Sequence, residues 1–142
     1  MATFVFYHEF KKFLGDGTID LDTHTFKAVL SNTAPVVGTE DQLADVTQIA
    51  NGNGYTTGGQ ALSSVTWSET GAGLGVWRWN AADFTWTASG GSIGTFRYVI
   101  IYDDTAAGGE LVGYYDYGTT VDITNGNAFT VDIGTNGIFE LS

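Results

Sequence analysis

The chain has 142 residues and a mass of 15.1 kDa, about the length of one domain. Sixteen acidic and five basic residues give a net charge of −11, which disfavours nucleic acid and anionic lipid as partners. Cysteine is absent, so disulfides, zinc–thiolate sites and thiol catalysis are excluded. No apolar run approaches the ~20 residues of a membrane span. We expect no secretory signal either, because Glu9, Lys11 and Lys12 interrupt the apolar stretch near the N-terminus.

The first predicted element is a short helix over residues 4–14, ended by Gly15. Its apolar side chains have helical spacing: Phe6, Phe10, Phe13 and Leu14. The run at residues 4–7 also has high strand propensity, so a strand is the alternative there. Residues 1–15 form a candidate anchor or interface segment, or alternatively a helix that packs on its own core.

The rest of the chain predicts short strands. Runs rich in Val, Ile, Thr and aromatic residues lie at 25–30, 61–67, 75–79, 84–87, 95–102, 111–117, 121–123, 129–133 and 138–141. One short helical turn is predicted within 41–49, where Leu43, Val46 and Ile49 lie three apart. We therefore expect a mainly β fold over residues 1–142, a single antiparallel β-sandwich or barrel-like domain with a short N-terminal helix.

Two local patterns refine this fold. Residues 98–102 are apolar throughout, which predicts a central strand that is covered on both faces or covered by a partner chain. Four Asn-Gly pairs predict type I′ turns, which require a positive φ at both central residues. The pairs begin at Asn51, Asn53, Asn125 and Asn136.

Motifs for chemistry are weak in this sequence. Asp16, Asp20 and Asp22 crowd three carboxylates into one segment, and whether they bind a cation stays open. The segment does not match an EF-hand loop, and a solvated turn is the favoured interpretation. His8 and His24 lie in no catalytic motif. We expect no catalytic residue, no metal and no cofactor.

Aromatic side chains are the better candidates for recognition. Trp77 and Trp79 share one strand face, with Arg78 on the other. We expect two or more of the four tryptophans to be buried and the rest to be able to meet a partner. The candidate interface residues are Phe4, Phe6, Phe10, Phe13, Trp77, Trp79, Tyr114 and Tyr115.

The order of several segments resembles a family of small structural proteins of tailed bacteriophages. These segments are 19–30, 31–35, 49–59, 96–105, 111–118 and 136–139. The more specific pieces are Gly54-Tyr55-Thr56-Thr57-Gly58-Gly59 and Tyr102-Asp103-Asp104-Thr105. The resemblance covers the chain from about Ile19 to Phe139.

The resemblance implies a non-enzymatic virion protein, of the capsid decoration (cement) or head-fibre type. It would lie on the outer surface of the head after synthesis in the host cytoplasm. Its implied partners are the major capsid protein and further copies of itself, with a trimer favoured. A tail-tip or fibre protein that binds a host-surface glycan is the first alternative. A glycan hydrolase with paired carboxylates is the second.

Overall fold

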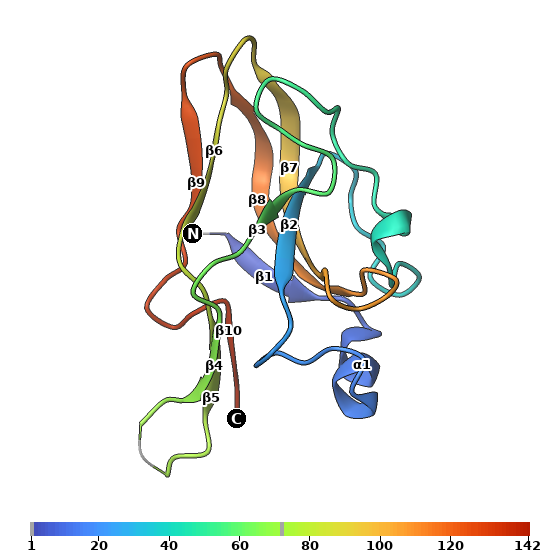
Figure 1. The fold of residues 1–142 in the computed structure, drawn as a ribbon, viewed down its shortest axis with the longest axis vertical. Helices are drawn as coiled ribbons and strands as arrows, with labels where there is room; N and C mark the ends of the chain where they lie inside the picture. Colours follow the sequence, from blue (N-terminus) through green and yellow to red (C-terminus); the bar gives the residue numbers. More distant parts are fainter. Residues whose placement is uncertain (1, 72) are drawn as a thin grey trace.

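The computed structural model describes residues 2–71 and 73–142. Its elements are β1 (Thr3–Phe6), α1 (Phe10–Asp16), β2 (Phe26–Ser31), the 3-10 turn η1 (Leu43–Asp45), β3 (Gln60–Ala61), β4 (Thr66–Glu69), β5 (Trp77–Asn80), β6 (Phe84–Thr87), β7 (Ile93–Asp103), β8 (Leu111–Ile123), β9 (Ala128–Val131) and β10 (Phe139–Leu141). They form antiparallel sheets in the orders β1-β8-β7-β2-β3, β10-β5-β4 and β6-β9 (Figure 1). The predicted mainly β, sandwich-like fold with one short helix and one helical turn is confirmed.

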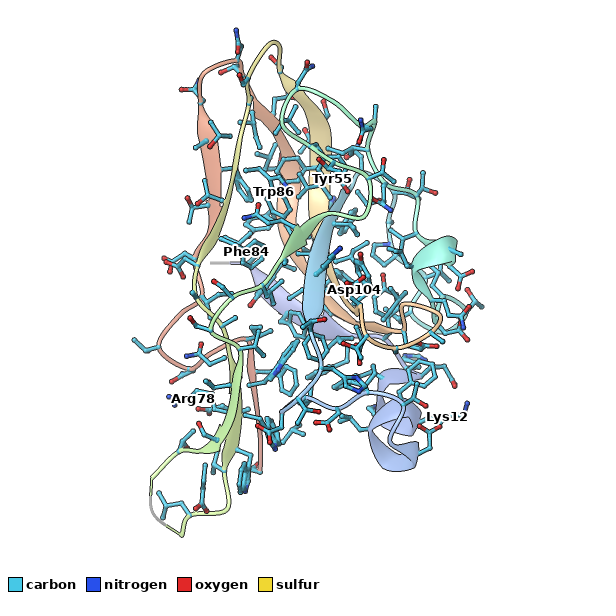
Figure 2. All side chains as sticks on the ribbon, viewed as in Figure 1. Lys12, Tyr55, Arg78, Phe84, Trp86 and Asp104 are labelled. Carbon is cyan, nitrogen blue, oxygen red and sulfur yellow. The ribbon has the colours of Figure 1, made fainter. Side chains whose placement is uncertain are left out.

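The larger core lies between the five-stranded sheet and the two smaller sheets. Val99 and Ile101 of β7 belong to it, as does Trp86 of β6. Trp86 and Tyr55 approach one another there, with their ring centroids 6.5 Å apart (Figure 2). A bulge between Phe96 and Tyr98 shifts the alternation of β7.

The second face of the five-stranded sheet is also covered. Tyr98, Ile100 and Tyr102 of β7 are buried on this side. The segment at residues 32–50, which contains η1, packs Val37, Leu43 and Val46 against them. Figure 1 shows η1 on the opposite side of the sheet from β6 and β9. The prediction that residues 98–102 form a central strand covered on both faces is therefore confirmed.

The predicted helix begins later than expected. Residues 3–6 form β1, which pairs with β8 from Thr3 opposite Asp116 to Phe6 opposite Gly113. The strand propensity of this run prevails because β8 offers it a complete hydrogen-bonding ladder. The helix α1 starts only at Phe10, and its C-cap is Gly17 with φ 81°, not Gly15.

Other boundaries differ for local reasons. The predicted strand over 61–67 divides into β3 and β4, and Ser64 between them has φ 52°. The two runs at 111–117 and 121–123 merge into the 13-residue strand β8. Among the Asn-Gly pairs, only Asn53 and Gly54 both have positive φ, so only this pair meets the predicted type I′ requirement.

Gly113 sets how closely β1 can approach β8. A Cβ atom at this position would lie 2.5 Å from the Val5 carbonyl oxygen and 2.6 Å from the Phe4 ring. We expect Gly113→Ala to displace β1 and to lower the free energy of unfolding by about 1–3 kcal/mol. Gly94→Ala in β7 is the matched control, because a Cβ there meets nothing within 4 Å. Equal urea midpoints for the two variants would contradict this account.

Candidate interaction surface

The three-stranded sheet carries an aromatic face. Trp79 lies opposite both Trp67 and Phe139, and Trp77 lies opposite Leu141. Alternation along each strand places these five side chains on the same face. The sequence predicted the shared face of Trp77 and Trp79, and the pairing of the strands adds the other three.

The inner half of this face is buried in the core. Trp79 is fully buried, and its ring lies edge-on to Phe26 with centroids 4.7 Å apart. Its indole N–H donates to the Leu21 carbonyl oxygen at 3.3 Å. Phe139 contacts Phe6 at a centroid distance of 4.9 Å. The inner half therefore joins the small sheet to β1 and β2.

The outer half extends beyond the core and is open to solvent. Trp77 is 41% exposed and Leu141 38% exposed. Trp67 is half-buried and stacks on Trp77 with centroids 5.7 Å apart. Arg78, labelled in Figure 2, pairs with Glu140 at 2.7 Å on the opposite face. The prediction that two or more tryptophans are buried is confirmed, since Trp86 joins Trp79 in the core.

Two adjoining hollows separate α1 from the C-terminal strand β10. One has a volume of about 330 Å³ and the other about 320 Å³. Leu14 and Leu141 line both of them. We call their union the α1–β10 groove; its remaining lining residues are Phe6, Phe10, Lys11, Gly17, Ile19, Asp20, Leu21, Asp22 and Trp67. The groove is therefore largely apolar, with carboxylates at one end and a lysine at the other.

The predicted interface residues divide into three groups. Phe10, Phe13, Trp79 and Tyr115 are buried within the chain, although Phe10 also lines the floor of the groove. Phe4 and Phe6 are half-buried around Phe139, and Phe6 also lines the groove. Trp77 is exposed, while Tyr114 is half-buried on the other side of the five-stranded sheet, against Tyr7 and Tyr98.

The aromatic pattern did not predict two exposed leucines near this surface. Leu74 in the β4–β5 loop is 73% exposed, and Leu141 forms part of the groove. The available signal for Leu74 is a single large apolar residue among the glycines at 71, 73 and 75. The position of Leu141 depends on the pairing of β10 with β5, which no local pattern encodes.

A buried carboxylate fastens the loop that follows β7. Asp103 is fully buried, and its carboxylate accepts hydrogen bonds from the backbone N–H groups of Thr105 at 2.9 Å and Ala106 at 3.1 Å. Its other oxygen lies 2.5 Å from Nδ1 of His24. His24 follows the segment that contains Asp20 and Asp22, so this pair ties one wall of the groove to the end of β7.

The Asp16 and Asp20 carboxylates stabilise turns by accepting local hydrogen bonds, and Asp22 takes part through its backbone N–H. The Thr18 hydroxyl and N–H hold the pKa of Asp16 below its usual value. The Thr23 hydroxyl, with the N–H groups of Asp22 and Thr23, does the same for Asp20. Within residues 2–71 and 73–142 no group of three or more His, Cys, Asp or Glu side chains could hold a metal ion.

Buried tyrosines make stability sensitive to alkaline pH. Burial raises the pKa of Tyr55 and Tyr102 to about 12 and also raises the pKa of Tyr7 and Tyr115. An unfolded tyrosine titrates near pH 10, so above that pH the unfolded chain loses protons that the folded chain retains. The contribution of these tyrosines to the free energy of unfolding is thus fully present below pH 10. It decreases from pH 10 to 12, by up to about 1.4 kcal/mol per pH unit for each tyrosine. Urea unfolding at pH 8 and pH 11 measures this, and equal midpoints would contradict it.

Comparisons with protein-family models, with curated proteins and with solved structures found no match for this chain. In the part of the chain that the structure describes, no helix has the length and apolar character needed to cross a membrane. The resemblance to phage structural proteins therefore stays a prediction.

Proposed function

We propose that this chain is a non-enzymatic structural protein of a tailed bacteriophage particle. In this proposal it is a capsid decoration protein that binds the major capsid protein on the outer surface of the head. Its task is to stabilise the mature shell by mass action, because a ligand that binds only the assembled state favours that state. Contact area, and not a chemical step, then supplies the activity.

The observation that carries the proposal is the exposed apolar surface at one end of a strongly acidic chain. Leu74, Trp77 and Leu141 are exposed there, and the α1–β10 groove lies beside them. Trp77 stacks on Trp67, which lines the groove together with Leu141. Contiguous apolar surface of this kind favours contact with another protein. Aromatic residues are also enriched in protein–protein interfaces. The segment resemblance adds the phage particle as the setting.

The first test asks whether the protein binds heads. Purified protein is mixed with expanded heads that lack it, and the heads are sedimented and then heated. We expect wild-type protein to sediment with the heads and to raise the temperature at which they release DNA. Trp77→Asp is expected to bind less. Val36→Asp, at a residue 55% exposed on the 32–50 segment, is the control with the same added charge. A wild-type protein that neither binds heads nor changes their heat tolerance contradicts the proposal.

A second test locates the protein on particles. Immunogold electron microscopy with an antibody against this chain is expected to label the heads of phage from the source. Label confined to the tail tip would favour receptor binding instead. Unlabelled particles would contradict a place on the outside of the virion.

A specific observation keeps glycan binding as the second candidate function. Trp67 and Trp77 form a stacked, partly exposed pair, and Trp67 lines the groove together with Asp20 and Asp22. Aromatic rings beside carboxylates suit the stacking and hydrogen bonding of a sugar. A glycan array in which wild-type protein binds and Trp77→Ala does not would support this function. An array without binding at high protein concentration would remove it.

A further inference from the structure

A third hollow lies between the five-stranded sheet and the β6–β9 sheet. Its volume is about 200 Å³, and we call it the β8–β9 pocket. One lining residue immediately precedes β1, two lie in β8, one lies in β9 and one follows β9. They are Ala2, Tyr115, Tyr117, Thr130 and Asp132. The pocket shares no lining residue with the α1–β10 groove, so it is a separate candidate site.

The Tyr115 hydroxyl is a buried polar group without a partner. Tyr115 is 3% exposed, and its hydroxyl oxygen makes no hydrogen bond among the residues that the structure describes. A buried hydroxyl in this condition costs free energy, which a new hydrogen bond recovers. Because Tyr115 lines the pocket, a molecule bound there can supply the missing partner.

The pocket has one charged side chain, the carboxylate of Asp132. None of the ion pairs found among the described residues includes Asp132. Burial and the charge of Asp132 raise the pKa of Tyr117 to about 12. The carboxylate therefore lies within electrostatic range of the Tyr117 phenol, and its negative charge is available to a ligand.

The lining selects a small cation with several N–H donors. No basic side chain lines the pocket, which disfavours an anion, and a single carboxylate is too few for Ca²⁺. The volume is also below the ~300–1,000 Å³ of pockets for drug-sized ligands. A primary ammonium group has three donors and no acceptor, and tyrosine rings attract cations.

The pocket offers several acceptor oxygens for these donors. Asp132 supplies a carboxylate and Tyr115 an unused hydroxyl. The Thr130 hydroxyl shares one hydrogen bond with Thr85 at 2.8 Å and keeps the capacity to accept another. Ala2 and the tyrosine rings give apolar surface for a short alkyl stem, as the stems of lysine side chains require.

We propose that the β8–β9 pocket binds the primary ammonium group of a short alkyl chain. The ammonium donates to the Asp132 carboxylate and to the Tyr115 hydroxyl oxygen, and its stem packs on the tyrosine rings. A free alkylamine and the end of a lysine side chain share this chemistry. The inference does not depend on the proposed function, because it concerns residues outside the groove and the exposed aromatic pair.

The first experiment titrates n-butylammonium chloride into the full-length, ¹⁵N-labelled chain at pH 7 and constant ionic strength, followed by NMR. We expect saturable shifts of the backbone amides at 115–117 and 130–132. Neutral n-butanol and anionic butyrate, with the same stem, are expected to leave these amides unshifted. Equal shifts with n-butanol, or unsaturable shifts spread over the acidic surface, would overturn the proposal.

Matched variants assign the site to its two polar groups. Asp132→Asn is expected to weaken binding of n-butylammonium by about tenfold or more, and Tyr115→Phe by about fivefold. Asp22→Asn removes the same charge from a residue that lines a different hollow, and it is expected to keep the wild-type affinity. Wild-type affinity in Asp132→Asn, or an equal loss in Asp22→Asn, would refute the site.

Stability separates recognition from a structural role of Tyr115. Its hydroxyl has no partner among the described residues, so Tyr115→Phe is expected to keep the urea midpoint while it weakens binding. A lower midpoint would show that the hydroxyl is already bonded in the free protein, and it would overturn its assignment to the ligand.

A second probe distinguishes the two sources of the ammonium group. Nα-acetyl-lysine N-methylamide carries the lysine side chain as it occurs within a protein. Affinity equal to that of n-butylammonium would assign the pocket to a lysine of a partner protein. Binding of n-butylammonium alone would assign it to a free alkylamine, and binding of neither would overturn the proposal. Head binding by Asp132→Asn keeps the two proposals apart, since we expect it to equal that of wild type.

Discussion

Trp79→Ala is expected to lower the free energy of unfolding by about 3–5 kcal/mol. The indole is fully buried between the three-stranded sheet and Phe26, and its N–H donates to the Leu21 carbonyl oxygen. Truncation would leave a large cavity and an unpaired buried carbonyl group. Urea unfolding followed by circular dichroism gives the value.

Trp77→Ala is the matched control, two residues away on the same strand face. Its indole is 41% exposed, so its removal is expected to cost less than about 1 kcal/mol. Similar losses in the two variants would mean that the outer half of the face is as important to folding as the inner half. That result would also weaken the assignment of the outer half to binding.

Asp103→Ala is expected to cost about 3 kcal/mol or more. The substitution leaves the N–H groups of Thr105 and Ala106 without their acceptor and removes the partner of His24. Because the Asp103 side chain is itself fully buried, its removal leaves a cavity that water enters only with rearrangement. Chemical denaturation at pH 7 measures the loss, and a protease-sensitive bond near residues 20–24 would report release of the groove wall.

Asp104→Ala provides the comparison at the next position. Its carboxylate, near the end of β7 in Figure 2, pairs with Lys27 at 3.5 Å while both side chains are over a third exposed. Exposed ion pairs contribute about 0–1 kcal/mol, so we expect little change in stability. A large loss in Asp104→Ala together with a small one in Asp103→Ala would refute the assigned roles.

The strands were predictable where a short run of the sequence is apolar throughout. The apolar run at 98–102 identifies the central strand, because apolar side chains that point to both faces of a sheet need a cover on each face. Residues 4–6 were assigned to a helix because helical spacing and strand propensity compete there. The long-range ladder with β8 decides between them, and it is not visible in a local window.

The candidate surface was predictable only in part. Alternation placed Trp77 and Trp79 on one face, but their exposure differs because the small sheet extends past the core between them. Leu74 and Leu141 become neighbours of this surface only when β5 lies between β4 and β10. No local pattern distinguishes Asp103 from the other carboxylates of this acidic chain, and only its contact with His24, 79 residues away in sequence, shows its structural role.

The division into three sheets also bears on colloidal behaviour. In the part of the chain that the structure describes, the outer edge of each sheet's end strands pairs with no further strand, and such edges can recruit strands from other molecules. At neutral pH the net charge of −11 opposes random encounters of this kind. Salt limits that repulsion to about 8 Å at physiological ionic strength, and it vanishes near the pI of about 4.1. Acidic buffers of high salt are therefore the conditions in which this protein is most prone to precipitate.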